Sequence, residues 1–325
     1  MTGPLLDVRN IKKHFPLGSG RLFGSKEKVH AVDGVTFSIA RGETLSLVGE
    51  SGCGKSTVGK AILRLFDVTA GEIYLDGRRI DALPARELRP YRKQMQVVFQ
   101  DPYSSLNPRM RVRDSIAEPL ICFGLATGHD DVEREVASLL DKVGLPRDAG
   151  KRWPHEFSGG QRQRICIARA LAAKPDLIVC DEAVSALDVS VKAQIVNLLA
   201  DLQRDLGLAM LFISHDLAIV EHMTQRVAVM YLGRIVEIGD RDDVFAAPQH
   251  PYTQALLSAV PVAEVGVRRE RIQLKGDVPS PINPPNGCHF HTRCPRAMER
   301  CRREAPQLRQ VTVTQKVACH LLDGN

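Results

Sequence analysis

Short runs of alternating apolar and polar residues fill residues 5–48 and end in the apolar stretch TLSLVG. Alternation with a period of two is typical of half-buried β-strands, and a short apolar run is typical of a buried strand. Helical spacing follows at residues 56–66, and strand patterns return at 71–80 and 95–100. The pattern therefore predicts a strand-rich N-terminal part that continues into a strand–turn–helix unit.

The pattern changes at residue 101, where strand signals disappear and helical spacing takes over until about residue 154. Beyond residue 160, helical segments alternate with the apolar runs LIVCDE and AMLFISHD, which predicts a mostly parallel sheet covered on both faces. From about residue 245, Pro and Arg become frequent and the periodicity fades. We therefore expect an N-terminal β-subdomain with the first part of the core at 1–100, an inserted helical subdomain at 101–157, the second part of the core at 158–245 and a C-terminal extension at 246–325.

The composition is that of a globular protein, with 325 residues, 44% hydrophobic and 25% charged. No apolar run approaches the ~20 residues that cross a bilayer, and the N-terminus shows no signal-peptide pattern, so we expect a cytoplasmic protein. The net charge of +6 is concentrated in residues 268–310, which contain ten Lys or Arg and four Asp or Glu. Such a basic stretch can face nucleic acid, anionic lipid or a bound anion.

The segment GESGCGKST, residues 49–57, fits the pattern G-x-x-x-x-G-K-[ST] between a predicted strand and a predicted helix. Its glycines allow backbone N–H groups to surround phosphate oxygens, and the helix N-terminus adds positive potential. Lys55 is expected to neutralise phosphate oxygens and Ser56 to bind Mg²⁺. The predicted contacts with ATP and Mg²⁺ in this loop are Gly49, Ser51, Gly52, Cys53, Gly54, Lys55, Ser56 and Thr57.

Two further sites carry chemistry. The strand LIVCD ends at Asp181, where α/β sheets bind ligands, so Asp181 is a candidate Mg²⁺ ligand and Glu182 a candidate to polarise the attacking water. The segment FSGGQRQR places Ser158, Gly159, Gly160 and Gln161 at the start of a helix. Backbone donors and a serine hydroxyl at that position form a second anion site, separate from the first.

These motifs resemble those of the ATP-binding subunits of ABC transporters. In order along the chain stand the phosphate-binding loop, Gln100 in VVFQDP, the signature FSGGQ, the Asp-Glu strand end, the loop SALD and His215 in FISHD. The resemblance implies an α/β P-loop NTPase (RecA-like) core, with an N-terminal antiparallel β-subdomain, an inserted α-helical subdomain and a small Cys-rich C-terminal extension. Phe157 stands where the signature usually has leucine, a change that leaves its donors intact.

The resemblance also implies how ATP is used. Two cassettes pack head to tail, and the signature of one contacts the ATP held by the loop of the other. Glu182 acts as the base, His215 holds the γ-phosphate and water, and Gln100 contacts Mg²⁺ and water. Phe15 is expected to stack on the adenine. The loop Ser185, Ala186, Leu187 and Asp188 is the D-loop of this family.

Within the family, the segments DPYSSLNPRM and HPYTQALLSAVP and the late cysteines resemble dipeptide and oligopeptide importers, and specifically their second ATPase subunit, the F subunit. This implies an ATPase that powers peptide import at the cytoplasmic face of the inner membrane. Its expected partners are a second ATPase subunit, in a heterodimer, two transmembrane permease subunits and, through the complex, an extracytoplasmic solute-binding protein. The alternative is a soluble ABC-type ATPase that acts on nucleic acid or ribosomes, with the basic stretch as its contact.

Four cysteines lie close together in the C-terminal extension: Cys288, Cys294, Cys301 and Cys319. Their spacing of 5, 6 and 17 intervening residues lacks the closely spaced pairs of structural zinc sites. Four thiolates also suit a [4Fe–4S] cluster, and some members of the resembled family hold one in this region. We expect a cluster ahead of Zn²⁺ and of unbound thiols or a disulfide, in a lobe that is separate from the catalytic machinery.

Overall fold

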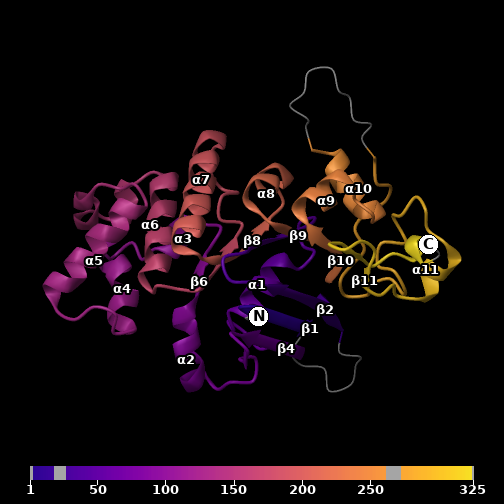
Figure 1. Ribbon diagram of the computed structural model, residues 1–325, viewed down its shortest axis with the longest axis horizontal. Coiled ribbons are helices and arrows are strands. Elements are labelled where there is room, and N and C mark those ends of the chain that lie inside the picture. Colours follow the sequence, from indigo (N-terminus) through magenta and orange to yellow (C-terminus); the bar gives the residue numbers. More distant parts are fainter. Residues whose placement is uncertain (1–2, 18–26, 261–271, 324–325) are drawn as a thin grey trace. The chain divides into compact units, whose positions relative to one another are not determined.

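The computed structural model describes residues 3–17, 27–260 and 272–323 (Figure 1). Pro261, the last residue of HPYTQALLSAVP, and residues 268–271 of the basic stretch lie outside these ranges. The chain divides into two compact units, which are described one at a time. The first unit contains residues 1–5, 39–43 and 82–213, and the second contains 6–38, 44–81 and 214–325.

The first unit contains three parallel neighbouring strands, β6 (Met95–Val98), β7 (Leu177–Asp181) and β8 (Ala209–Ser214), in the order β8-β7-β6. All residues of β7 and β8 are buried. Strands that are covered on both faces are apolar throughout instead of alternating, so the runs LIVCD and AMLFIS became strands as predicted. Because the strands are parallel, their carboxyl ends share one edge.

Helices make up the rest of the first unit. The segment 101–157, which is fully described, contains helices and 3₁₀ turns but no strand, as its pattern predicts. Helices α4, α5 and α6 contact one another and lie side by side in Figure 1. The helical elements of this unit are α2 (Ala85–Gln94), α3 (Pro102–Ser105), α4 (Val112–Cys122), α5 (His129–Lys142), η1 (Arg147–Lys151), η2 (Pro154–Glu156), α6 (Gly159–Ala172) and α7 (Val189–Leu206).

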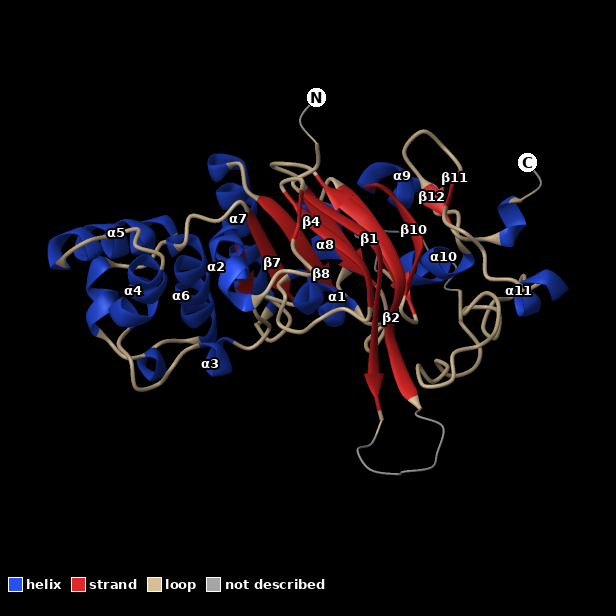
Figure 2. Ribbon diagram, turned by 90° about the horizontal axis from the view of Figure 1, so that it is seen from below, coloured by secondary structure: helices blue, strands red, loops and turns tan. Residues whose placement is uncertain are grey.

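The second unit contains two groups of strands, whose longer members are visible in Figure 2. One is a four-stranded sheet in the order β2-β1-β4-β5, in which β1 pairs antiparallel with β4. The other has the order β11-β12-β10-β9-β3, with β3 parallel to β9 and the other pairs antiparallel. The bounds are β1 (Leu6–Pro16), β2 (Lys28–Ile39), β3 (Thr44–Val48), β4 (Ala70–Leu75), β5 (Arg78–Arg79), β9 (Arg226–Tyr231), β10 (Arg234–Asp240), β11 (Arg309–Gln310) and β12 (Lys316–Val317).

The C-terminal residues pack into this second unit. Strand β12 continues the sheet at β10, where the Ala318 N–H donates to the Val236 carbonyl at 2.8 Å. Phe290, from the cysteine-rich segment, is 1% exposed and contacts Tyr231 at the end of β9. The helical elements of the unit are α1 (Lys55–Ile62), α8 (Leu217–Met223), α9 (Arg241–Ala246), α10 (Pro251–Ser258), α11 (Glu299–Arg303) and η3 (His320–Leu322).

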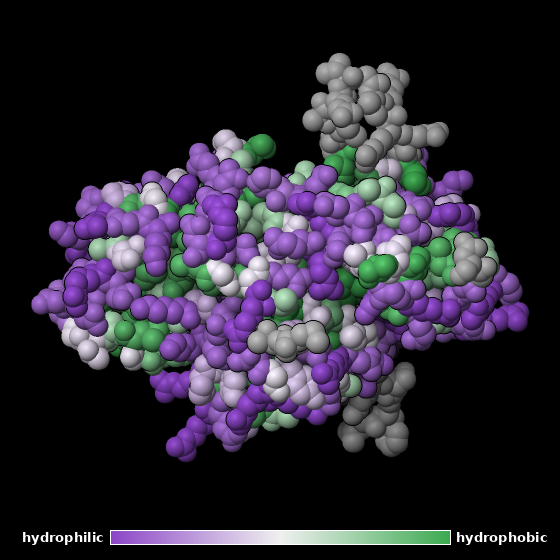
Figure 3. Space-filling model, in the orientation of Figure 1, coloured by the Kyte–Doolittle hydropathy of each residue, from purple (hydrophilic) through white to green (hydrophobic). Residues whose placement is uncertain are grey.

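Within the described parts of the chain, every helix is too short or too polar to cross a membrane. The face shown in Figure 3 is mainly hydrophilic, and the hydrophobic residues that reach it form small groups among polar ones.

Candidate functional site

The phosphate-binding loop lies between β3 and α1, in the strand–turn–helix arrangement that the sequence predicts. Its three glycines have positive φ angles: 153° at Gly49, 80° at Gly52 and 105° at Gly54. A Cβ atom on Gly49 would lie within 3.0 Å of the Met230 carbonyl oxygen, and one on Gly54 would lie equally close to a backbone oxygen of β2. Gly49 and Gly54 are therefore required for two reasons: the backbone conformation favours glycine, and no space is left for a Cβ atom.

Lys55 lies inside the curve of this loop. Its side chain is buried, and its ammonium donates to the Gly49 carbonyl at 2.8 Å and to the Glu50 carbonyl at 2.9 Å. The charge is thus held where the sequence predicts contact with phosphate oxygens. Burial raises the pKa of the neighbouring Cys53 thiol, although Lys55 opposes the shift. A protonated thiol is a poor nucleophile.

The predicted acidic residues lie at the edge formed by the carboxyl ends of the parallel strands in the first unit. Asp181 is the last residue of β7 and is 7% exposed. Gln100 follows the neighbouring strand β6 by two residues, which brings it to the same edge. Glu182 has a positive φ of 51°, and its N–H donates to the Ile213 carbonyl of β8 at 3.0 Å. A left-handed backbone is uncommon at residues other than glycine, although Asn10, Arg64, Asp76, Lys174 and Leu232 share it in this chain.

The signature residues begin α6 with a reciprocal cap. The Ser158 hydroxyl accepts from the Gln161 N–H at 3.3 Å, and the Gln161 side-chain oxygen accepts from the Ser158 N–H at 3.0 Å. The Cβ positions of both glycines face the D-loop and α7: a Cβ on Gly159 would lie 3.5 Å from Leu187, and one on Gly160 would clash with Val191. The signature therefore presents a bare backbone at a helix N-terminus, as an anion site requires.

The D-loop connects this helix start to the catalytic edge within the first unit. The Ser185 N–H and hydroxyl both donate to the Glu182 carbonyl at 3.0 Å, and Asp188 precedes the first residue of α7. The structure thus brings together the D-loop, the signature and the predicted base.

Phe15 and His215 belong to the second unit. Phe15 lies near the end of β1, where its ring contacts Phe66 at 5.5 Å and the Lys13 ammonium lies 4.9 Å from its centroid. His215 lies between the end of β8 and the start of α8. Their predicted roles, adenine stacking and γ-phosphate contact, stay predictions.

The C-terminal extension contacts the phosphate-binding loop. Arg293, between two of the four cysteines, forms two hydrogen bonds with the Glu50 carboxylate, at 2.8 and 3.2 Å. Burial alone would lower the pKa of Arg293, but its bonds to Glu50 and Tyr231 raise it. The expectation that the cysteine lobe is separate from the catalytic machinery is therefore wrong, because a partly buried ion pair joins the lobe to the phosphate-binding loop.

Aromatic side chains support this contact. Tyr231, Tyr252 and Phe290 pack with ring centroids 4.7 to 5.4 Å apart, and the Tyr252 hydroxyl accepts from the Glu50 N–H at 2.9 Å. His250 caps α10 by accepting from the Tyr252 N–H through Nδ1, and burial lowers its pKa to about 3, so the ring is neutral as this bond requires. In the sequence, HPYTQALLSAVP carries only a family resemblance, and no local pattern in it indicates the structural role of its His and Tyr.

The four late cysteines are free thiols gathered in one lobe. The Cys288 N–H donates to the Cys301 carbonyl at 2.8 Å. Burial, reinforced by the charges of the other three sulfurs, raises the pKa of Cys288 to about 11. Thiols that affect one another's ionisation are close in space, although they are spread over 32 positions of the sequence.

Among the described residues, one set of three candidate metal-ligating atoms lies within 4.8 Å of one another, in His14, His30 and Asp33. The Asp33 carboxylate is already paired with Arg234, at 2.7 Å, and with Lys12, at 3.6 Å. These two cations oppose the entry of a metal ion, so we interpret the set as an ion-pair network beside two tilted histidine rings, whose centroids lie 4.1 Å apart.

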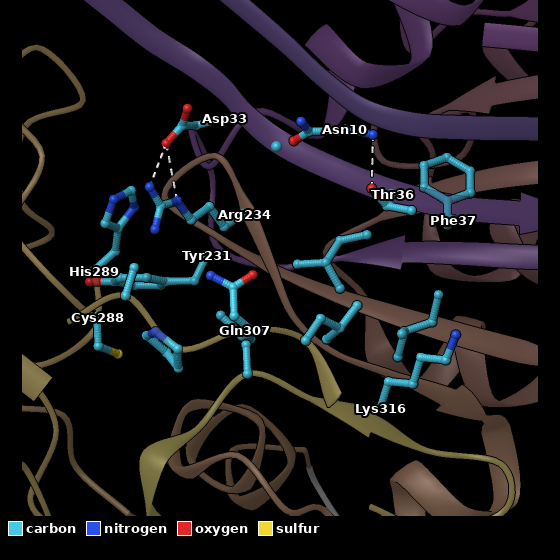
Figure 4. Close-up of a pocket in the computed structure, with 18 of the residues that line it drawn as sticks. Asn10, Asp33, Thr36, Phe37, Tyr231, Arg234, Cys288, His289, Gln307 and Lys316 are labelled. Atoms are coloured by element: carbon cyan, nitrogen blue, oxygen red, sulfur yellow. Dashed lines mark hydrogen bonds and ion pairs between the residues drawn. The ribbon is translucent and has the colours of Figure 1, made fainter. Parts of the chain in front are cut away.

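A cavity of about 780 Å³ in the second unit opens beside this network (Figure 4). Its lining combines residues of β1 and β2 with residues of β9, β10 and the C-terminal lobe. The labelled members are Asn10, Asp33, Thr36, Phe37, Tyr231, Arg234, Cys288, His289, Gln307 and Lys316. No local sequence signal identifies it, because its walls come from segments more than 200 residues apart.

We predict that Gly54→Ala weakens ATP binding at least about tenfold, because the added Cβ must displace either the loop or β2. Equilibrium binding of a fluorescent ATP analogue measures the change. Gly77→Ala is the matched control: Gly77 also has a positive φ, of 76°, but its Cβ would meet no atom within 4 Å. The control should lose about 1 kcal/mol of stability and keep parental affinity. Equal effects of the two variants would contradict the steric argument.

Comparisons with known proteins agree with this geometry. The family model for the ABC transporter matches residues 32–185, and the model for the oligopeptide/dipeptide transporter C-terminal region matches residues 236–301. A Sinorhizobium fredii protein named as a peptide ABC transporter ATP-binding protein, y4tS, is 53% identical over 99% of this chain and 91% of its own length. The Bacillus subtilis oligopeptide transport ATP-binding protein AppF is 51% identical over 98% of this chain and 97% of its own length.

Solved structures show the same fold. The dimeric ATP-binding cassette MJ0796 bound to ADP and Pi matches with a TM-score of 0.65 and 28% identity, over 73% of this chain and 98% of that one. The cassette cbiO1 from Clostridium perfringens matches with a TM-score of 0.64 and 26% identity, over 75% of this chain and 91% of that one. The chain belongs to the ATP-binding subunits of ABC transporters, in the branch that carries the oligopeptide/dipeptide transporter C-terminal region.

Proposed function

We propose that this chain hydrolyses ATP to power the import of di- and oligopeptides across the cytoplasmic membrane, as one ATPase subunit of an ABC transporter. The single observation that supports this best is the pairing of the cassette with the oligopeptide/dipeptide transporter C-terminal region in one chain. Relatives at 51–53% identity over nearly the whole chain carry peptide-transport names. No such relative supports action on nucleic acid or ribosomes.

In this proposal the work of the site is divided among the predicted residues. The loop from Gly49 to Thr57 and the Lys55 ammonium bind the phosphates of ATP, while Ser56 and Asp181 bind Mg²⁺. Glu182 is the base for the attacking water, assisted by Gln100 and His215. The supporting observations are the bare backbone donors of the loop, the buried Lys55 and the backbone conformation of Glu182.

The signature, Ser158–Gln161, is proposed to contact ATP held by a second cassette. Its serine and glutamine cap the start of α6 reciprocally, and its two glycines lie against the D-loop and α7. The related cassette MJ0796 is a dimer in its structure. Two ATPase subunits, two permease subunits and an extracytoplasmic solute-binding protein then form the working complex, with this chain at the cytoplasmic side of the inner membrane.

We also propose the division of the chain into an N-terminal β-subdomain with the first part of the core (1–100), a helical subdomain (101–157), the second part of the core with the signature helix (158–245) and the C-terminal extension (246–325). The helix-only segment 101–157 supports it, as does the loop-rich character of the described residues after 246, which form only short helices and two two-residue strands. The extension nevertheless packs within the second unit.

Replacing Glu182 by Gln should lower the rate of ATP hydrolysis at least about 100-fold, the contribution typical of a general base, while ATP binding stays near parental. Phosphate release by the assembled transporter measures the rate, and equilibrium binding measures the affinity. Glu221→Gln, at an exposed glutamate of α8, is the control. Parental turnover by Glu182→Gln would contradict the assignment of the base.

Affinity purification of the tagged chain from detergent-solubilised membranes should recover two integral membrane proteins and a second ATPase subunit. The proposal predicts this outcome because the chain carries the oligopeptide/dipeptide transporter C-terminal region and is proposed to work as one subunit of a transport complex. Mass spectrometry identifies the co-eluting proteins. Recovery of nucleic acid instead, with binding that falls steeply as salt rises, would favour the alternative class.

The cysteine lobe is proposed to hold a [4Fe–4S] cluster on Cys288, Cys294, Cys301 and Cys319, with a structural role. The spacing of 5, 6 and 17 intervening residues lacks the closely spaced cysteine pairs of structural zinc sites. A cluster binds each thiolate through a different iron and tolerates such spacing. When bound, the cluster would crosslink the four cysteines and so close the three stretches of chain between them.

Anaerobically purified protein should therefore contain about four iron and four sulfide per chain and absorb visible light. Cys301→Ser should lower the iron content, because Cys301 is buried among the other three thiols. Cys122→Ser, at an exposed thiol of α4, is the control and should keep the metal. A colourless protein with one zinc per chain would overturn the cluster.

A further inference from the structure

Glu50, the second residue of the phosphate-binding loop, is fixed at each of its polar groups. Its carboxylate bonds to Arg293, and its N–H donates to the Tyr252 hydroxyl at 2.9 Å. Its carbonyl accepts from the Lys55 ammonium at 2.9 Å and from the Cys53 N–H at 3.3 Å. The first two partners lie in the C-terminal extension and the last two in the loop itself, so Glu50 is the point where the extension contacts the loop.

The Arg293 side chain has the properties of a rigid support. It is only 9% exposed, and both terminal nitrogens bond to the two oxygens of one carboxylate. A planar guanidinium in such a two-bond arrangement fixes orientation as well as distance. The Arg293 N–H donates to the Phe290 carbonyl at 3.0 Å, so the side chain projects from a closed turn.

The turn that carries Arg293 is held by the core of the second unit. Phe290 is 1% exposed and packs against Tyr231 and Tyr252, of which Tyr252 is fully buried. Tyr231 ends β9, the strand that pairs with β3 directly before the loop. The loop and its support are thus anchored to the same sheet, and a shift of the turn changes the position of Glu50.

We propose that Arg293 is a positioning residue for ATP: through Glu50 it holds the phosphate-binding loop in the shape that receives the phosphates. This inference rests on the proposed use of ATP and assigns the extension a part in it. Because Arg293 lies between Cys288 and Cys294, whatever orders the cysteine lobe also orders the ion pair. The extension then acts on nucleotide binding without touching the nucleotide.

A double-mutant cycle on the full chain tests the pair, with the dissociation constant of a fluorescent ATP analogue as the readout. Arg293→Gln and Glu50→Gln should each weaken binding at least about tenfold, or about 1.4 kcal/mol, because each removes the two-bond contact that holds Glu50 and leaves a partly buried charge without its partner. The double variant should bind the analogue at most about threefold more weakly than the weaker-binding of the two single variants. Arg293→Lys, which keeps the charge but loses the two-bond geometry, should fall between parent and Arg293→Gln.

Arg296→Gln is the matched control. Arg296 lies three residues further in the same lobe, but it is exposed and bonds to Gln254 instead of the loop. It should keep parental affinity, and thermal unfolding of all variants separates altered binding from loss of the fold. If Arg293 only stabilised the fold, Arg293→Gln would lower the melting temperature, and its effect on ATP affinity would not depend on Glu50.

Two results would overturn the positioning role and leave the proposed function standing. In the first, Arg293→Gln binds ATP with parental affinity. In the second, the fold-losses in affinity of the two single variants multiply in the double variant, as they do for independent sites. A parent chain that bound no ATP would instead overturn the proposed function itself.

Discussion

The close approach of the phosphate-binding loop to the strands behind it is the constraint on which the site depends. At Gly49 and Gly54 the backbone lies so near to neighbouring carbonyl oxygens that no Cβ atom fits. Within the loop, the carbonyls of Gly49 and Glu50 hold the Lys55 ammonium inside the curve. A backbone in this position can surround phosphate oxygens, and a side chain at either glycine would remove the space that makes it possible.

The ATP chemistry is distributed over residues with different structural supports. Lys55 and Ser56 depend on the loop and on the start of α1, whereas Asp181 and Glu182 depend on the buried strand β7. The signature depends on a helix cap, Ser158 with Gln161. Each support is local, and each leaves donors or carboxylates at an edge where a charged ligand can reach them.

The C-terminal extension is more closely integrated than its composition suggests. Its strand β12 continues the sheet at β10, Phe290 joins a buried aromatic cluster, and Arg293 reaches Glu50. Loop-rich segments with many Pro and Arg residues give few periodic signals, yet they can be held by a few buried anchors. In this protein the anchors are aromatic rings and one ion pair, and the four thiols lie in the lobe that these anchors hold in place.

The sequence alone determined the main strands and helices of the cassette, the loop glycines and the family, because each depends on short-range patterns. Apolar runs in parallel strands, glycines with positive φ and a serine helix cap leave local signals that the structure reproduces. Only the tertiary structure decided that Arg293 pairs with Glu50, 243 positions away, and that Tyr252 accepts from the same residue. Such contacts depend on how distant segments pack, and no local sequence pattern around an arginine or a tyrosine identifies its partner.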